Sequence, residues 1–215
     1  MQTHFSPTPK VDIHQNQETV IFLLQTIQRP GIENLIDYLL TSDYFTAPAS
    51  TKFHNVCEGG LCHHSLKVMR MFSEENKLWG KPIPQDSVII CGLLHDLCKI
   101  RAYRKTSNGY ESVKGEKGHA SLSILRIKKY IELTLAEDDL IRFHMGLHGL
   151  YVYKEYYALP MYQAILRTPQ VQLFAALDQA DSKRKMKSNC GRPPQPKGWG
   201  MQGPPAVILE LFSVL

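Results

Sequence analysis

The sequence has no long apolar run and no cysteine framework. None of its 215 residues lies in a window that approaches the roughly 18 consecutive apolar residues of a membrane-spanning helix. The first ten residues, MQTHFSPTPK, lack the apolar core of a secretory signal peptide. The five cysteines are odd in number and show no framework spacing, which fits a reducing compartment. These absences argue against a membrane protein and a disulfide-stapled secreted domain, and we expect a cytoplasmic protein.

The sequence also lacks the paired spacing of a structural zinc site and any internal repeat. Cys57, Cys62 and His63 are close in sequence, but no second Cys or His pair follows at finger spacing. A hydrophobic fraction of 43% and a charged fraction of 21% are those of an ordinary globular protein. We expect an arm over residues 1–13, one domain over 14–189 and a Pro/Gly-rich tail over 190–215, whose apolar end can dock on the body or on a second subunit.

Helical periodicity covers most of the chain, and turn signals separate the periodic segments. Pro30 stands where a second helix would begin, Asp86 or Ser87 is placed to cap the helix that holds His95, and Thr134 is placed to cap a later one. The expected helices are TVIFLLQTIQ, IENLIDYLL, Leu61 to about Trp79, the segment around GLLHDLCKI, HASLSILRIKKYIEL, AEDDLIRFHMGLHG and VQLFAALDQADSKRKM. Asn108-Gly109 between alternating residues predicts a small β-hairpin. The fold class is therefore an all-α bundle with a β-hairpin insertion.

Polar side chains recur inside these apolar helices. A lone histidine on an apolar face is most often a core residue whose hydrogen bonds are satisfied, so no single one of them indicates a site. Imidazole and carboxylate together, however, are ligands of Zn, Fe, Mn, Co and Ni, and helices can hold them rigidly inside a bundle. The recurrent residues are His64, His95 with Asp96, His119, His144 with His148, and Asp178 with Asp181. Their recurrence favours a metal site.

The neighbours His95 and Asp96 add a geometric constraint. Successive helix residues diverge by about 100°, so the two reach one ion only if it lies above the edge that their faces share. A carboxylate that gave one oxygen to each of two ions would make this pair the hinge of a dinuclear site. Water bound there would have its pKa lowered toward neutrality and could attack phosphorus.

The order of His64, His95-Asp96 and Asp181 resembles the HD-domain superfamily of metal-dependent phosphohydrolases. FHNVCEGGLCHHSLKV is similar to the stretch around the first histidine in bacterial and phage members. LLHDLCKI resembles their central helix, and QADSK resembles their closing Ala-Asp. GHASLSIL and RFHMG resemble the additional histidines of the dinuclear branch. The resemblance covers roughly residues 45–187 and implies the HD-domain helical bundle.

The resemblance also implies a ligand set and a cofactor. The first ion would be held by His64, His95, Asp96 and Asp181, and the second by Asp96 as a bridge with His119 and His144. We expect one or two divalent ions, drawn from Mn, Fe, Co, Ni, Zn and Mg.

Substrate contacts are expected around this metal set. Lys99, one turn beyond His95, would neutralise a phosphate, the alternative being an exposed lysine at a helix end. Lys52 and His54 precede the first ligand helix in a loop that such proteins place over the site. His148 is one turn after His144, but dinuclear relatives often carry two adjacent histidines there, so its role stays open between substrate contact and structure.

The leading functional hypothesis is a hydrolase that cleaves a phosphoester or phosphoanhydride bond of a nucleotide. A 3′-exonuclease on single-stranded nucleic acid would use the same core, and the aromatics of GLYVYKEYYALPMY would then line a groove rather than close a hydrophobic core. A di-iron oxygenase would use the same ligand types. A module that only senses nucleotides fits least, because every expected ligand position is filled. The expected partner is a phosphorylated small molecule, and no binding to a membrane is expected. Binding of nucleic acid and formation of a homo-oligomer stay open.

Overall fold

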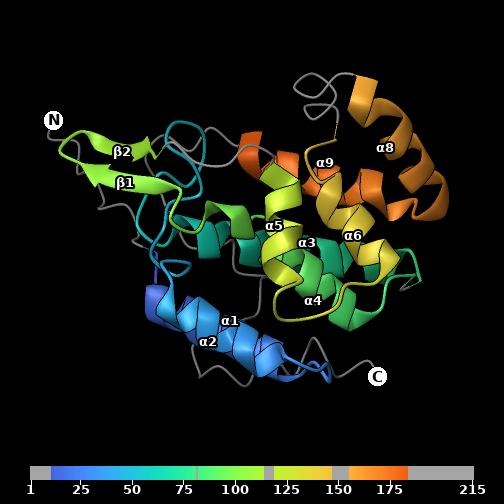
Figure 1. Cartoon of the computed structure of the whole chain (residues 1–215), viewed down its shortest axis with the longest axis horizontal. Helices are drawn as coiled ribbons and strands as arrows, with labels where there is room; N and C mark the ends of the chain where they lie inside the picture. The colour runs from blue at the N-terminus through green and yellow to red at the C-terminus, as the bar shows by residue number, and fades with distance from the viewer. Residues whose placement is uncertain (1–10, 81, 114–118, 147–154, 184–215) are drawn as a thin grey trace, which may run out of the picture.

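The computed structural model describes residues 11–80, 82–113, 119–146 and 155–183, and in them the chain is mostly α-helical with one two-stranded antiparallel sheet (Figure 1). The elements are α1 (Ile13–Gln25), α2 (Ile32–Thr41), α3 (Gly60–Leu78), α4 (Gln85–Leu94), the 3-10 helix η1 (Leu97–Lys99), β1 (Tyr103–Thr106), β2 (Gly109–Ser112), α5 (His119–Ile127), α6 (Leu135–Arg142), α8 (Glu155–Arg167) and α9 (Gln170–Lys183). The all-α class with a small hairpin is confirmed.

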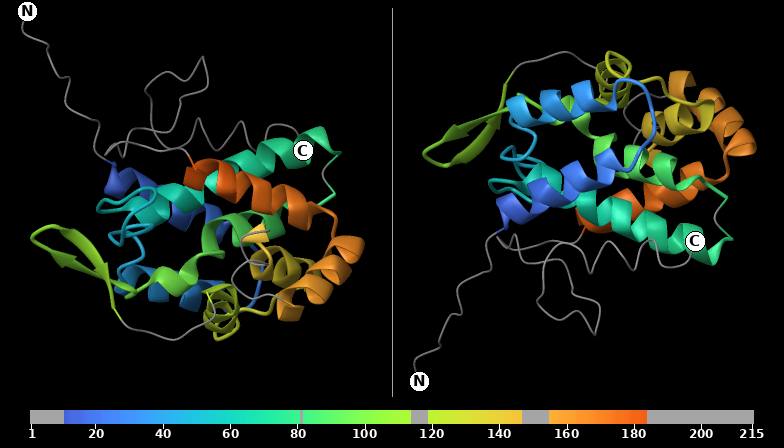
Figure 2. Two further views of the ribbon diagram at one scale, coloured as in Figure 1. Left: turned by 90° about the horizontal axis from the view of Figure 1, so that it is seen from above. Right: turned by 90° about the horizontal axis from the view of Figure 1, so that it is seen from below.

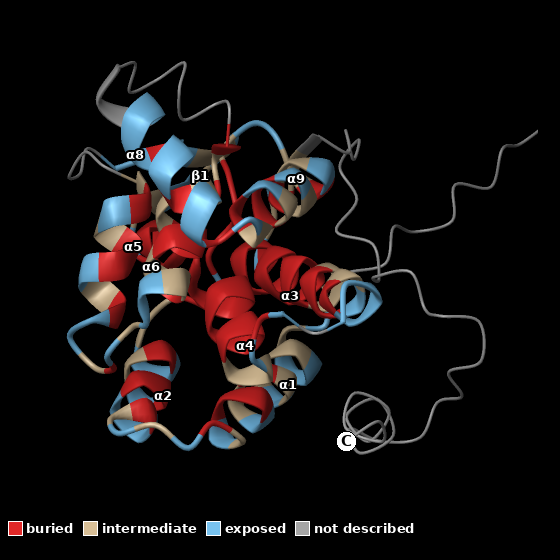
Figure 3. Ribbon diagram, turned by 90° about the vertical axis from the view of Figure 1, so that its right-hand side faces the viewer, coloured by how far each residue is buried: buried red, intermediate tan, exposed pale blue. Residues whose placement is uncertain are grey.

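Helices α3 and α4 form the centre of the molecule. Both are buried along most of their length, as the burial colours of Figure 3 show. The two helices pack closely at Gly92, which has no side chain; an added Cβ there would lie 2.4 Å from Met69 Cβ. Helix α9 lies alongside α3, and the hairpin projects from the end opposite α8 (Figure 2). Helix α6 contacts both α4 and α9, and α5 contacts α6 and η1, so the elements that supply the site lie together around the α3–α4 pair.

Two helix starts differ from the sequence-based expectation, and one agrees with it. Asp12 Oδ1 accepts a hydrogen bond from Gln15 N at 3.0 Å, so α1 begins at Ile13, inside the segment predicted as an arm. Pro84 occupies the N-cap position of α4, so the prediction that Asp86 or Ser87 caps this helix is wrong. The predicted cap of α6 is confirmed as a capping box between Thr134 and Glu137.

The hairpin lies where Asn108-Gly109 predicted it. Thr106 pairs with Gly109, so Ser107 and Asn108 form a two-residue loop. Gly109, with φ of +124°, is already the first residue of β2. The turn is thus centred on Ser107 and Asn108, one residue earlier than the Asn-Gly pair. The positive φ of Gly109 is a conformation that glycine adopts without steric cost.

Three helices end before their periodic pattern does, and one helix was not predicted. Helix α4 ends at Leu94 rather than running through Ile100, α5 ends at Ile127 rather than at Leu133, and α6 ends at Arg142, so that His144 lies in the following turn. Helix α8, which contains Pro160, was not predicted. Among the described residues, no helix has both the length and the apolar character that a bilayer-crossing helix needs. The whole of the predicted 190–215 tail and residues 1–10 of the predicted arm lie outside the described residues.

Candidate metal centre

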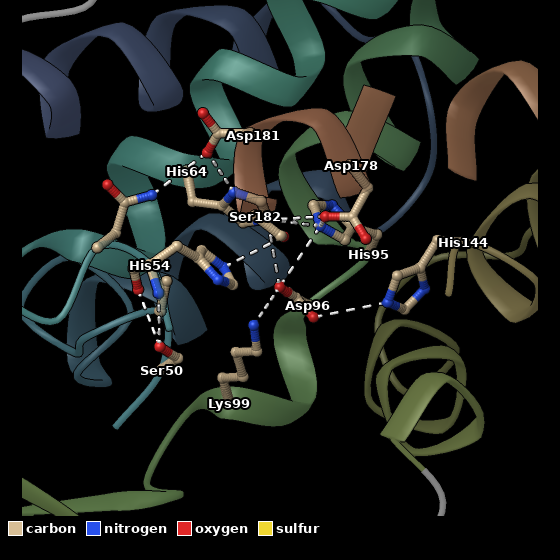
Figure 4. A network of polar contacts seen from close by, with 12 residues as sticks. Ser50, His54, His64, His95, Asp96, Lys99, His144, Asp178, Asp181 and Ser182 are labelled. Atoms are coloured by element: carbon tan, nitrogen blue, oxygen red, sulfur yellow. Dashed lines mark hydrogen bonds and ion pairs between the residues drawn. The ribbon is translucent and has the colours of Figure 1, made fainter. Parts of the chain in front are cut away.

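Five parts of the chain bring polar side chains to one buried place beside α3 and α4, and Figure 4 labels those from α3, the end of α4, α9 and the turn after α6. His64 comes from α3, His95 from the end of α4, and Asp178 from α9. Asp96 follows His95, His119 is the first residue of α5, and His144 lies in the turn after α6. His64, His95, Asp96 and His144 are each no more than 2% exposed. A donor set so deeply buried needs a positive partner for its carboxylates.

The end of α4 explains how neighbouring residues share one site. His95 keeps helical dihedral angles, with φ −55° and ψ −33°, whereas Asp96 leaves the helix with φ −102° and ψ 21°. The two side chains thereby turn the same way, and His95 Nε2 lies 3.5 Å from Asp96 Oδ2. The prediction of one continuous helix through this pair is wrong: the helix ends where the two faces would have diverged.

A first cluster surrounds Asp96 Oδ2. His64 Nε2 lies 3.6 Å from this oxygen and 3.3 Å from His95 Nε2. Asp178 Oδ1 approaches the same two nitrogens, at 3.1 Å from His64 and 3.7 Å from His95. Two imidazole nitrogens and two carboxylate oxygens thus converge, which is a donor set that fits a divalent transition metal. His64, His95 and Asp96 can place one ligand atom each within 4.8 Å of the others.

Asp181 lies on the other side of the His64 ring. Its Oδ2 is 2.8 Å from His64 Nδ1 and accepts a hydrogen bond from Asn55 Nδ2 at 3.3 Å. Its Oδ1 pairs with the buried Lys67 ammonium. The resemblance implied Asp181 as a ligand of the first ion. In the structure the carboxylate oxygen that faces the Nε2 cluster belongs to Asp178, and Asp181 contacts Nδ1 on the other side of the His64 ring.

A second cluster surrounds the other oxygen of Asp96. Oδ1 lies 2.7 Å from His119 Nε2 and 3.7 Å from His144 Nε2. It is buried and accepts no well-directed hydrogen bond from the described part of the chain. Asp96, His119 and Cys98 form a further group whose donor atoms can converge on one ion. The described residues offer no third such group, so Cys62 and His63 are not part of one.

A family model describes the same region. The model of the HD domain matches residues 61–182, more than half of the chain. The chain belongs to the HD domain family. No curated protein and no solved structure gave a match. HD domains are generally hydrolases that bind divalent metals, so membership supports metal-dependent hydrolysis at that level.

Lys99 is part of the HD domain's interior and not an exposed helix-end residue. Its Nζ lies 2.6 Å from Asp96 Oδ2, and the residue is 8% exposed. Burial alone would lower the pKa of Lys99, but the Asp96 carboxylate raises it above the ordinary value. Burial likewise would raise the pKa of Asp96, and Lys99 with His95 and His119 holds it well below its usual range. Lys99 and Asp96 are therefore both charged.

The loop before α3 brings His54 next to this cluster of histidines and carboxylates. The His54 ring lies 4.8 Å from the His64 ring, and His54 Nε2 is 3.5 Å from Ser182 Oγ. Burial, reinforced by His64, lowers the pKa of His54 to about 4, so its ring is neutral at pH 7. Lys52, in the same loop, is exposed, and no described contact links it to the centre. His148 lies outside the described residues.

Three residues of the centre were not assigned a site role from the sequence. Asn55 and Lys67 hold Asp181, and Cys98 contacts His119. Lys67 carries a usable signal, because it lies one helical turn after His64 and so projects from the same face. Asn55 and Cys98 carry none, since each reaches its partner through the tertiary fold.

Proposed function

We propose that this HD domain is a dinuclear metal-dependent phosphohydrolase that cleaves a phosphoester or phosphoanhydride bond of a nucleotide. One observation carries the dinuclear part: the two oxygens of Asp96 face two different histidine clusters. The nucleotide as substrate follows from the resemblance of the ordered motifs.

In this proposal Asp96 would contribute to both ions. The first ion would be held by His64, His95, Asp96 and Asp178, and the second by Asp96, His119 and His144. Such ions supply Lewis acidity and lower the pKa of water. Asp178 replaces Asp181 in the ligand set because its Oδ1, at 3.1 Å, faces His64 Nε2, whereas Asp181 faces Nδ1.

The residues around the ions are suited to a phosphate. Lys99 places a buried positive charge 2.6 Å from Asp96, where it can offset the charge of a phosphoryl oxygen. His54 Nδ1 is buried without a hydrogen-bond partner in the described part of the chain. A neutral imidazole with one unused nitrogen can donate to a phosphate oxygen or accept from a hydroxyl. Both groups lie on the Asp96 Oδ2 side of the centre.

The test combines metal content with a nucleotide screen. Protein purified without added metal should carry about two ions per chain. When it is incubated with a panel of nucleoside mono-, di- and triphosphates, it should release phosphate or a nucleoside monophosphate from at least one of them. Abundant iron with oxygen uptake and no phosphate release would support an oxygenase instead. Release of mononucleotides from single-stranded DNA, with intact free nucleotides, would support an exonuclease.

A pair of isosteric variants tests the ligand assignment. Asp178→Asn should lose the first ion and phosphate release together. Asp181→Asn should keep the ion with roughly 10–100-fold weaker affinity, as expected when an orienting partner is removed. If Asp181→Asn loses the ion and Asp178→Asn keeps it, the assignment is reversed.

A further inference from the structure

The four histidines of the centre share one arrangement. Each turns Nε2 toward Asp96 and has a partner for Nδ1 on the other side of the ring. For three of them this partner is an oxygen: Asp181 Oδ2 for His64 at 2.8 Å, Gly92 O for His95 at 3.0 Å and Ile141 O for His144 at 2.6 Å. For His119 it is sulfur, because Cys98 Sγ lies 3.0 Å from Nδ1.

His119 has the least packing to hold its ring. Its side chain is 29% exposed, whereas those of His64, His95 and His144 are 0%, 0% and 2% exposed. It is also the first described residue of α5. A ring with this freedom depends on its Nδ1 partner for orientation more than the three buried rings do.

Cys98 is itself fixed to α5. Its backbone N–H donates to Ser123 Oγ at 3.0 Å, and Ser123 lies one turn after His119 on the same helix. Arg126, further along α5, donates to the carbonyl of Leu97 at 2.8 Å. Cys98 is 6% exposed, so the sulfur has little space in which to move away. The sulfur and the imidazole are therefore held at one separation by the backbones that carry them.

We propose that Cys98 is a positioning residue for the second ion: its sulfur accepts a hydrogen bond from His119 Nδ1–H and thereby leaves Nε2 unprotonated toward Asp96 Oδ1. This inference rests on the proposed dinuclear function. The contact distances favour it over direct ligation, because Sγ is 3.0 Å from Nδ1 but 3.9 Å from Nε2, the nitrogen that faces Asp96. With an ion bound, the imidazole would be neutral with its proton on Nδ1, the tautomer that metal-binding histidines require.

Titration of metal-free protein with Co²⁺ tests the proposal. Cys98→Ala should weaken the second ion about 10–100-fold and leave the first unchanged, as loss of an orienting partner does. Cys98→Ser should bind the second ion within a few-fold of wild type, because its hydroxyl oxygen can accept the same hydrogen bond. The near-ultraviolet spectrum of the Co²⁺-loaded wild type should lack a thiolate-to-cobalt charge-transfer band. If Cys98→Ala does not fold, Cys98→Val takes its place as the variant without an acceptor.

Cys91→Ala is the matched control, since Cys91 is buried in α4 and its sulfur lies 3.9 Å from the carbonyl of Glu137, away from the centre. It should bind both ions as wild type does. Unchanged binding in Cys98→Ala overturns the proposal, because Cys98 then only fills space. Equal loss in Cys98→Ser and Cys98→Ala, together with a charge-transfer band, also overturns it and makes Cys98 a ligand. A wild type that binds a single Co²⁺ overturns the dinuclear function, and the Cys98 role with it.

Discussion

Asp96 is the residue on which the centre depends most. Lys99 and three imidazole rings lie within 3.6 Å of its two oxygens, and His144 lies at 3.7 Å. We expect Asp96→Ala to lose bound metal and all measurable hydrolysis, because it removes the carboxylate that we propose as the bridge between the two ions.

The Asp96→Ala variant should also melt at a lower temperature, since Lys99 is left buried without its partner. Adding Lys99→Met should recover the melting temperature and not the activity. Metal analysis, phosphate release and thermal melts check the three parts. Activity above a few per cent of wild type in Asp96→Ala would show that this carboxylate does not bridge.

The number of ions in the proposed centre depends on whether His119 and His144 bind metal. Replacing either by Gln keeps a polar group of similar volume, and it should lower bound metal from about two to about one per chain and turnover by orders of magnitude. His63→Gln is the control, because His63 is buried in α3 next to His64 but is not part of the donor clusters. Variants of His119 and His144 that keep both metal and turnover but melt several degrees lower would make these two residues core histidines.

At the scale of residues, the sequence indicated which side chains lie in the centre better than which of their atoms face one another. His64, His95 and Asp96 interrupt apolar helices, so their chemistry is visible in the pattern. Asp178 and Asp181 lie one turn apart on α9 and share a helical face, so no periodicity separates a residue that faces Nε2 from one that faces Nδ1. The burial of Lys99 likewise depends on the 3-10 turn, which the pattern does not predict.

Among the elements, the contact of α4 with α3 sets the position of His95. An added Cβ at Gly92 would lie 2.4 Å from Met69 Cβ and 2.5 Å from its Cα. We expect Gly92→Ala to push α4 away from α3, to cost about 1–3 kcal/mol, and to weaken binding of the first ion because His95 follows within one turn. The melting temperature should fall by roughly 2–12 °C.

Gly80→Ala is the control for that change, since Gly80 has a φ of +77° but nothing within 4 Å of its added Cβ. It should lower stability through backbone strain alone and leave metal binding as it is. Equal metal loss in the two variants would contradict a steric role for Gly92.

Helix positions were predictable from periodicity, whereas helix ends near the site were not. The apolar pattern continues past Leu94 into Leu97 and Ile100, because η1 is as buried as α4, so nothing in the composition indicates where the helix changes geometry. Helix α8 departs from expectation for the opposite reason. Pro160 is a helix breaker by its chemistry, yet it lies inside α8, at an exposed position.

Across the whole molecule, one buried ion pair ties distant helices together. Glu137 of α6 binds Arg29, between α1 and α2, through two hydrogen bonds of 2.8 and 2.9 Å. Its Oε1 also accepts from Ser87 of α4 at 2.7 Å. Burial would raise the pKa of Glu137, but Arg29 and Ser87 outweigh it and lower the pKa below the ordinary 4.5. The carboxylate thus joins three parts of the bundle.

We expect Glu137→Gln to cost about 3 kcal/mol near neutral pH, because it leaves Arg29 without its counter-charge. The folded pKa lies below the unfolded one, so the stabilisation is complete above about pH 4.5 and is lost as the pH falls through the folded value. The difference in melting temperature between wild type and variant should therefore be constant near pH 7 and shrink below about pH 4.5. A difference independent of pH across that range would contradict this role.

The contact between His64 and Asp181 joins residues 117 positions apart. During synthesis, α3 leaves the ribosome before α9. Until α9 has been made, His64 and Lys67 therefore lack their contacts with the carboxylates of α9. Closing so long a segment costs chain entropy before any contact offsets it, and such contacts form late in folding. Ions that bind the finished centre stabilise only chains that have reached α9. Binding of the proposed first ion, which would need Asp178, would therefore distinguish chains that include α9 from truncated ones that already carry all four histidines.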